Sequence, residues 1–213
     1  MKTTSFAALF LCACGGTVST TQSVQDLAPE RNSAIVHVPL FIRDASGHIP
    51  ADSSALIYEV RKGNPVLAPD GHQLTLAEFN APQGRASVKC VQQGTHAVLE
   101  LTGLIPDGVY TVWNVVFRSP GFDPTFANLI GLGAIGEPDG RNSFTADSSG
   151  AASISAITPG GLLSVFGSIA GCALTGEFEF HLVGAYHIDG QTHGATPGPD
   201  GTYVEQFGFI FKR

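Results

Sequence analysis

Four residues in the last third of the chain have the chemistry of metal ligands. Glu179, His181 and His187 lie in one run of alternating polar and apolar residues, and His193 follows it. Zinc or copper would need three or four such ligands, each at about 2.0–2.3 Å. His181 and His187 share a strand face but lie roughly 20 Å apart, so one ion cannot join them. We expect His181 to pair with Glu179, and His187 to approach His193 across the turn at Asp189-Gly190.

The rest of the sequence shows no catalytic signature. The only methionine is Met1, so the axial ligand typical of a blue-copper site is missing. The chain has no Gly-x-Ser-x-Gly nucleophile motif and no glycine-rich phosphate loop. Its net charge of −7 argues against a nucleic-acid partner, which requires a basic surface. We therefore expect no catalytic residues, no enzyme activity, no cofactor and no nucleic acid.

Two cysteines, Cys90 and Cys172, lie in the body of the chain, each near a predicted strand. An oxidising compartment outside the cytoplasm favours a disulfide between them. The alternative is a pair of buried thiols that act as small apolar residues. The sequence leaves both alternatives open.

The first residues have the layout of an export signal. Lys2 precedes the short apolar run 6–14, which is far shorter than the ~20 apolar residues of a membrane-spanning helix. Leu11-Cys12-Ala13-Cys14, followed by Gly15, resembles the lipobox of bacterial lipoproteins. The resemblance implies cleavage before Cys14, lipidation of its sulfur and a place in the bacterial cell envelope. Gly15, where an aspartate would retain the protein in the inner membrane, implies the outer membrane.

The lipobox divides the chain into three parts. Residues 1–13 are the expected signal peptide, and residues 14–33 are the expected lipidated N-terminus and flexible tether. This segment is polar and lacks hydrophobic periodicity. A coil of about 19 residues spans roughly 25 Å, enough to hold a domain clear of the lipid headgroups. Residues 34–213 are the expected folded domain.

The domain alternates short apolar runs with turn residues. Pro-Asp-Gly, which suits a type I turn, occurs at 69–71, 106–108, 138–140 and 199–201. The predicted strands are 34–43, 56–61, 86–92, 95–102, 109–117, 129–135, 151–157, 177–187 and 203–211. Only 74–79 and 159–166 suggest a helical turn. This pattern predicts an all-β fold, an immunoglobulin-like antiparallel β-sandwich of roughly 8–10 strands with little helix.

The segment 109–117 is apolar on both faces, which indicates a central, doubly covered strand. We expect its Trp113 in the core rather than in a binding surface. Leu101–Phe117 and His181–His187 resemble segments of uncharacterised exported bacterial proteins. They share Tyr110-Thr111, Trp113 and the two spaced histidines. This resemblance implies a β-sandwich and no particular activity.

Two functions follow from these observations. The first is a lipid-anchored envelope protein whose non-enzymatic domain binds a protein or ligand partner or has a structural role. The second is a metal-binding envelope protein that uses His181, His187 or His193. Convergence of these histidines with a carboxylate would favour the second.

The lipid anchor is tested by replacing its acceptor sulfur. Cys14→Ser should move the protein from the membrane fraction to the soluble fraction, because multiple buried acyl chains hold a lipoprotein on a bilayer. Fractionation and immunoblotting measure the shift, with Cys12→Ser as the matched control. Cys14→Ser protein that remains with the membranes would contradict the assignment.

Overall fold

The computed structural model describes residues 30–136, 141–175 and 178–212. The expected signal peptide, Cys14 and most of the expected tether lie outside these residues. The elements are β1 (Arg31–His37), η1 (Pro39–Phe41), β2 (Ile42–Arg43), β3 (Tyr58–Glu59), α1 (Leu76–Phe79), β4 (Gln83–Val91), β5 (Gly94–Thr102), β6 (Val109–Arg118), β7 (Leu129–Ala134), β8 (Ser143–Thr145), β9 (Ala152–Pro159), β10 (Gly161–Leu162), β11 (Phe166–Ile169), β12 (Phe178–His187) and β13 (Tyr203–Lys212).

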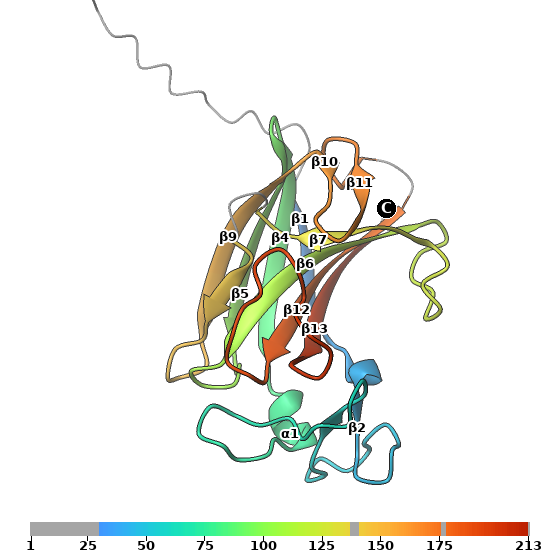
Figure 1. Ribbon diagram of the computed structural model, residues 1–213. Coiled ribbons are helices and arrows are strands. Elements are labelled where there is room, and N and C mark those ends of the chain that lie inside the picture. Colours follow the sequence, from blue (N-terminus) through green and yellow to red (C-terminus); the bar gives the residue numbers. More distant parts are fainter. Residues whose placement is uncertain (1–29, 137–140, 176–177, 213) are drawn as a thin grey trace, which may run out of the picture.

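Eleven of the strands form one antiparallel sheet that curls around a single core. Its order is β10-β11-β7-β6-β12-β13-β1-β4-β5-β9, and β8 pairs with β6. β8 also lies against β9, so the sheet nearly closes on itself (Figure 1). The all-β antiparallel class expected from the sequence is confirmed. Because the sheet curls, its two halves face each other across the core, as the layers of a sandwich do.

Alternation along the strands places large aromatic side chains inside the curl. Tyr110, Tyr186, Phe207 and Phe209 are fully buried there. The Tyr110 hydroxyl accepts a hydrogen bond from the Ile105 amide at 2.9 Å and donates one to Gln206 Oε1 at 3.1 Å. β6 is buried over nearly its whole length and is paired on both sides by β12, β7 and β8, as expected for a central strand.

Residues 42–80, with β2, β3 and α1, cover one end of the curled sheet (Figure 1). Its apolar side chains Ile57, Leu74 and Phe79 pack into the main core. α1 confirms the helical turn expected at 74–79, and it begins with a capping box between Thr75 and Glu78. The Tyr186 hydroxyl donates to Leu67 O at 2.7 Å, which joins this segment to β12.

Three local predictions were wrong, two of them where proline or glycine interrupts a strand. The expected strand 34–43 ends at His37, because Pro39 has no N–H and begins the short helix η1. The expected helical turn at 159–166 is a β-hairpin instead. There Gly161 has a φ of 133°, and Gly161–Leu162 pairs with Ser168–Ile169. The third is the expected strand 56–61, which keeps only Tyr58–Glu59 as β3, because the Glu59 carboxylate accepts from the Arg61 and Lys62 amides and the chain turns there. β1 starts at Arg31, three residues before the expected start of the domain.

A disulfide joins Cys90 of β4 to Cys172, which follows β11, with the two Cα atoms 5.4 Å apart. Both cysteines are buried. Next to the bridge, the Ala173 amide donates to Thr95 Oγ1 at 2.7 Å. The structure thus pairs the two cysteines, and the bridge closes a loop with a sequence separation of 82 residues.

Loss of this bridge should destabilise the fold, because it restricts a long loop in the unfolded chain. A loop of this length is worth about 4 kcal/mol, or about 10 °C in Tm for a domain of this size. Thermal unfolding with and without reductant measures the shift, and Cys90→Ala/Cys172→Ala should not respond to reductant. Peptide mapping that finds both cysteines alkylated before reduction would show that no bridge forms.

Candidate functional site

The outward face of β12 carries three of the expected ligands. Glu179, His181 and His187 alternate along this strand, as predicted. The structure separates them into two groups, because His181 and His187 stand at opposite ends of the strand. The His181 side chain hydrogen-bonds to Glu179 through Nε2, and Lys212 Nζ lies 3.1 Å from Glu179 Oε2.

Electrostatics at the first group keep His181 neutral and Glu179 charged. Burial lowers the pKa of His181, and this effect outweighs the opposing hydrogen bond to Glu179. Burial also raises the pKa of Glu179, but the hydrogen bonds from His181 and Lys212 bring it below its usual value. Glu179 and His181 are therefore hydrogen-bond partners of each other, as the sequence analysis expected.

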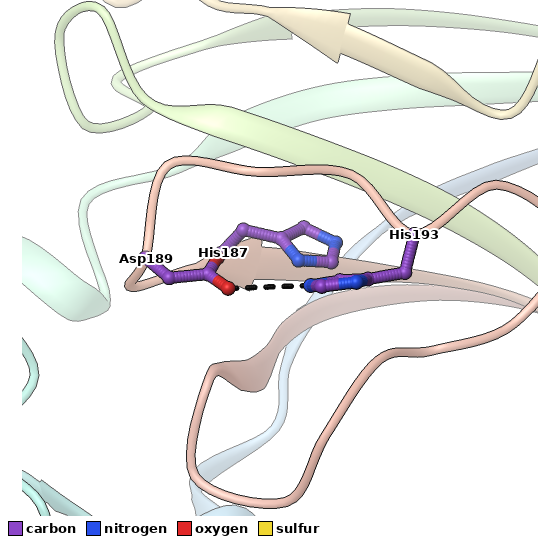
Figure 2. A group of neighbouring side chains, drawn as sticks. All are labelled: His187, Asp189 and His193. Carbon is purple, nitrogen blue, oxygen red and sulfur yellow. Dashed lines mark hydrogen bonds and ion pairs between the residues drawn. The ribbon is translucent and has the colours of Figure 1, made fainter.

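The second group forms where β12 ends. Gly190, with a φ of 68°, turns the chain directly after Asp189, and its amide donates to His187 O at 3.2 Å. The chain then returns His193 to Asp189, with 3.2 Å between His193 Nε2 and Asp189 Oδ2. One ligand atom from each of His187, Asp189 and His193 lies within 4.8 Å of the others. Figure 2 shows the three side chains converging, with the His187 ring facing the Asp189–His193 pair.

Packing restricts the His193 ring. Gly198 has a φ of 96°, and a Cβ at this position would overlap the His193 ring. Only glycine therefore lets the loop 190–199 bring its backbone against this side chain. Asn142 Nδ2 donates to Gly194 O at 3.2 Å and joins the same loop to the turn directly before β8.

His187 is the fixed member of the group and is only 1% exposed. Its Nε2 lies 2.9 Å from Thr111 Oγ1, which also accepts a hydrogen bond from Trp113 Nε1 at 2.9 Å. Its Nδ1 is buried and has no hydrogen-bond partner. When the ring proton is on Nε2, the ring donates to Thr111 and Nδ1 presents a lone pair. Burial lowers the pKa of His187 to about 4, so the ring is neutral at neutral pH.

Two imidazoles and one carboxylate are a ligand set that zinc and copper accept. Ligands bonded tetrahedrally at about 2.1 Å would lie about 3.4 Å apart, so the group has to contract slightly. Asp189 is exposed and His193 is half-buried, both on a turn, so these two can move toward His187. Thr111 would hold His187 from behind, as the outer partner of a ligating histidine commonly does.

The sequence prediction included His187 and His193 but missed Asp189, which it assigned only to the turn. The His-x-Asp spacing across a tight turn was the signal that could have found it. Trp113 is buried, as predicted, but it lies on the outer side of the sheet in a small second cluster with Ala134, Ala185 and Tyr203. Sequence reasoning also missed Thr111, which orients the His187 ring.

No protein-family model matches this chain, and a search among curated proteins found no match. None of the helices in the described part of the chain has the length and apolar character needed to cross a membrane.

Replacing Thr111 tests its role as the shared acceptor. Thr111→Val keeps the shape of the side chain but leaves the buried Trp113 and His187 N–H groups without an acceptor, so the free energy of unfolding should fall by about 1–3 kcal/mol. Urea unfolding followed by fluorescence measures it. Thr145→Val, on the exposed face of β8, should stay within about 0.5 kcal/mol of wild type. Equal stability of the two variants would contradict this assignment.

Proposed function

We propose that this protein is a lipid-anchored, non-enzymatic binding protein of the bacterial cell envelope, and that its domain binds a divalent transition metal. The ligands would be His187, Asp189 and His193. The observation that carries this proposal is the buried Nδ1 of His187, which has no hydrogen-bond partner and belongs to a ring that faces the Asp189–His193 pair (Figure 2).

Three arguments from physical chemistry favour a metal ion bound between these side chains. A buried polar atom without a partner costs about 1–3 kcal/mol, and coordination would remove that cost. The neutral imidazole of His187 can ligate a metal without first losing a proton. The carboxylate of Asp189 supplies negative charge against the cation. His181 would not take part, because it binds Glu179 at the other end of β12.

The envelope location rests on the lipobox-like residues Leu11 to Cys14. One feature of the domain is compatible with it. The start of β1 and the β10–β11 hairpin lie at the same end of the sheet. Arg31 pairs with Val88 near the end of β4, and Gly94, at the start of the next strand β5, pairs with Pro159 just before β10. This hairpin exposes Leu162 (88%) and Phe166 (53%), apolar side chains suited to contact with lipid.

Zinc titration tests the metal site directly. Full-length Cys14→Ser protein, purified without a histidine tag, should bind about one equivalent of Zn²⁺ at neutral pH by isothermal titration calorimetry. His193→Ala should weaken this binding at least tenfold, since even outer partners of metal ligands contribute about 10–100-fold. The side chain of His193 is only half-buried, so the His193→Ala variant should still fold.

Two histidine controls make the zinc result specific. His48→Ala, at an exposed loop, and His181→Ala, on the same strand but outside the group, should bind zinc as the parent protein does. Binding of less than about a tenth of an equivalent by the parent would exclude the site. A loss in His181→Ala as large as that in His193→Ala would also contradict this ligand set.

A further inference from the structure

The outer face of β6, β12, β13 and β1 is apolar, although the inner face of the same strands already packs on the core. The outer side of an antiparallel sheet is usually polar and in contact with water. Here it forms the floor of a groove with a volume of about 510 Å³. Its floor includes Val36, Trp113, Val115, Val183 and Ile210. The volume lies in the range of small-molecule sites, about 300–1,000 Å³.

Two segments form the side walls of this groove. On one side the loop 119–128 places Phe122 and Phe126 against Phe117, with ring centroids 5.4 and 6.1 Å from it. Phe126 has a φ of 58°, an uncommon backbone conformation for an aromatic residue. Phe122 and Phe126 nevertheless remain 46% and 40% exposed. The loop thus holds two aromatic rings beside the groove without burying them.

The opposite wall comes from η1 and from Arg61, which follows β3. The Arg61 guanidinium lies 4.5 Å from the Tyr203 ring centroid and 5.4 Å from that of Phe41. Arg61 Nη2 donates to Glu205 Oε1 at 2.6 Å, and Arg61 Nε lies 3.7 Å from Asp200. Phe41, Arg61, Tyr203 and Glu205 all line the groove.

The charges that border the groove leave no cationic excess for an anionic ligand. Arg61 is matched by Glu205 and by the nearby Asp200. At the other end Lys212 is matched by Glu179. Arg61 Nη1 and Glu205 Oε2 are buried without hydrogen-bond partners, so one donor nitrogen and one acceptor oxygen of this pair are unused. A neutral group that both accepts and donates a hydrogen bond complements them, whereas a carboxylate would face Glu205.

We propose that this groove binds a neutral amphiphile, an aliphatic alcohol whose chain lies along the apolar floor and whose hydroxyl meets Arg61 and Glu205. The alkyl chain would cover Val183, Gly208 and the aromatic wall and remove them from water. Both polar atoms are buried, so the two side chains would first turn toward the groove; the hydroxyl oxygen would then accept from Arg61 Nη1, and its hydrogen would be donated to Glu205 Oε2. The site is distinct from the metal ligands and does not depend on them.

The chain has a single tryptophan, and it lies in the floor of the groove, so binding has a built-in reporter. Titration of the full-length Cys14→Ser protein with 1-decanol should give a saturable change in Trp113 fluorescence. Decanoate, with the same chain length and a negative charge, should bind about tenfold more weakly. No saturable change with decanol, or decanoate binding as tightly as decanol, would overturn the proposal.

Gly208 offers a variant that fills the groove without disturbing the sheet. A Cβ at Gly208 would lie 3.5 Å from Leu182 O and 3.6 Å from Val36 Cγ2, which are ordinary contacts. Gly208→Leu should therefore fold, as circular dichroism would show, and should weaken decanol binding by about tenfold or more. Ser153→Leu adds the same alkyl group at an exposed position on β9 and should leave binding unchanged. Wild-type affinity in folded Gly208→Leu would place the ligand elsewhere and overturn the proposal.

Glu205→Gln tests the head group. The amide keeps the shape of the side chain but removes the negative charge, so the preference for decanol over decanoate should fall about fivefold or more. The ratio of the two affinities is the readout, because it does not change if the variant only alters stability. An unchanged ratio would show that the head group does not meet Arg61 and Glu205.

Discussion

The pleat of β12 constrains every candidate site in this protein. Side chains alternate between the two faces of a strand, so the residues that fill the core on one side fix the residues presented on the other. Phe180, Leu182 and Tyr186 point into the curled sheet, and this places Val183, Ala185 and His187 on the outer face. Continuous pairing with β6 from Phe178 to His187 holds β12 in that register, and β13 pairs with its other edge from Glu179 onward, with one register shift between Gly184 and Ala185.

One outer face therefore serves two purposes. In its middle, small and apolar side chains form the floor of the groove. At its end His187 is held by Thr111, and Trp113 links both regions because its ring lines the groove while its N–H donates to Thr111. A ligand in the groove and a metal on His187 would therefore both change the fluorescence of Trp113. The polar groups at the other end of β12 are already satisfied by one another and define the limit of the groove.

The sequence predicted the strands well, because alternation and turn residues are local signals. The alternation in β12 and the two apolar faces of β6 were both recognised, and the pairing of His187 with His193 followed from the turn at Asp189-Gly190. The groove was not predicted. In the sequence, an apolar residue on the outer face, such as Trp113, has the same pattern as a core residue. Whether it lines a groove depends on how the sheet curls and on the loop 119–128, which is distant in sequence and borders the groove. Asp189 was missed because Asp-Gly is a common turn sequence, and the turn accounted for this aspartate without the His-x-Asp spacing being considered.

The proposed metal site depends most on the orientation of the His187 ring, with Nε2 toward Thr111 and Nδ1 free to bind an ion. Long-range ¹H–¹⁵N correlation spectra of the histidine rings, recorded with and without Zn²⁺, measure this directly. We expect His187 to carry its proton on Nε2, and we expect zinc to shift the Nδ1 resonance of His187 together with the ring signals of His193. A His187 ring protonated on Nδ1, or one whose nitrogens do not respond to zinc, would contradict it.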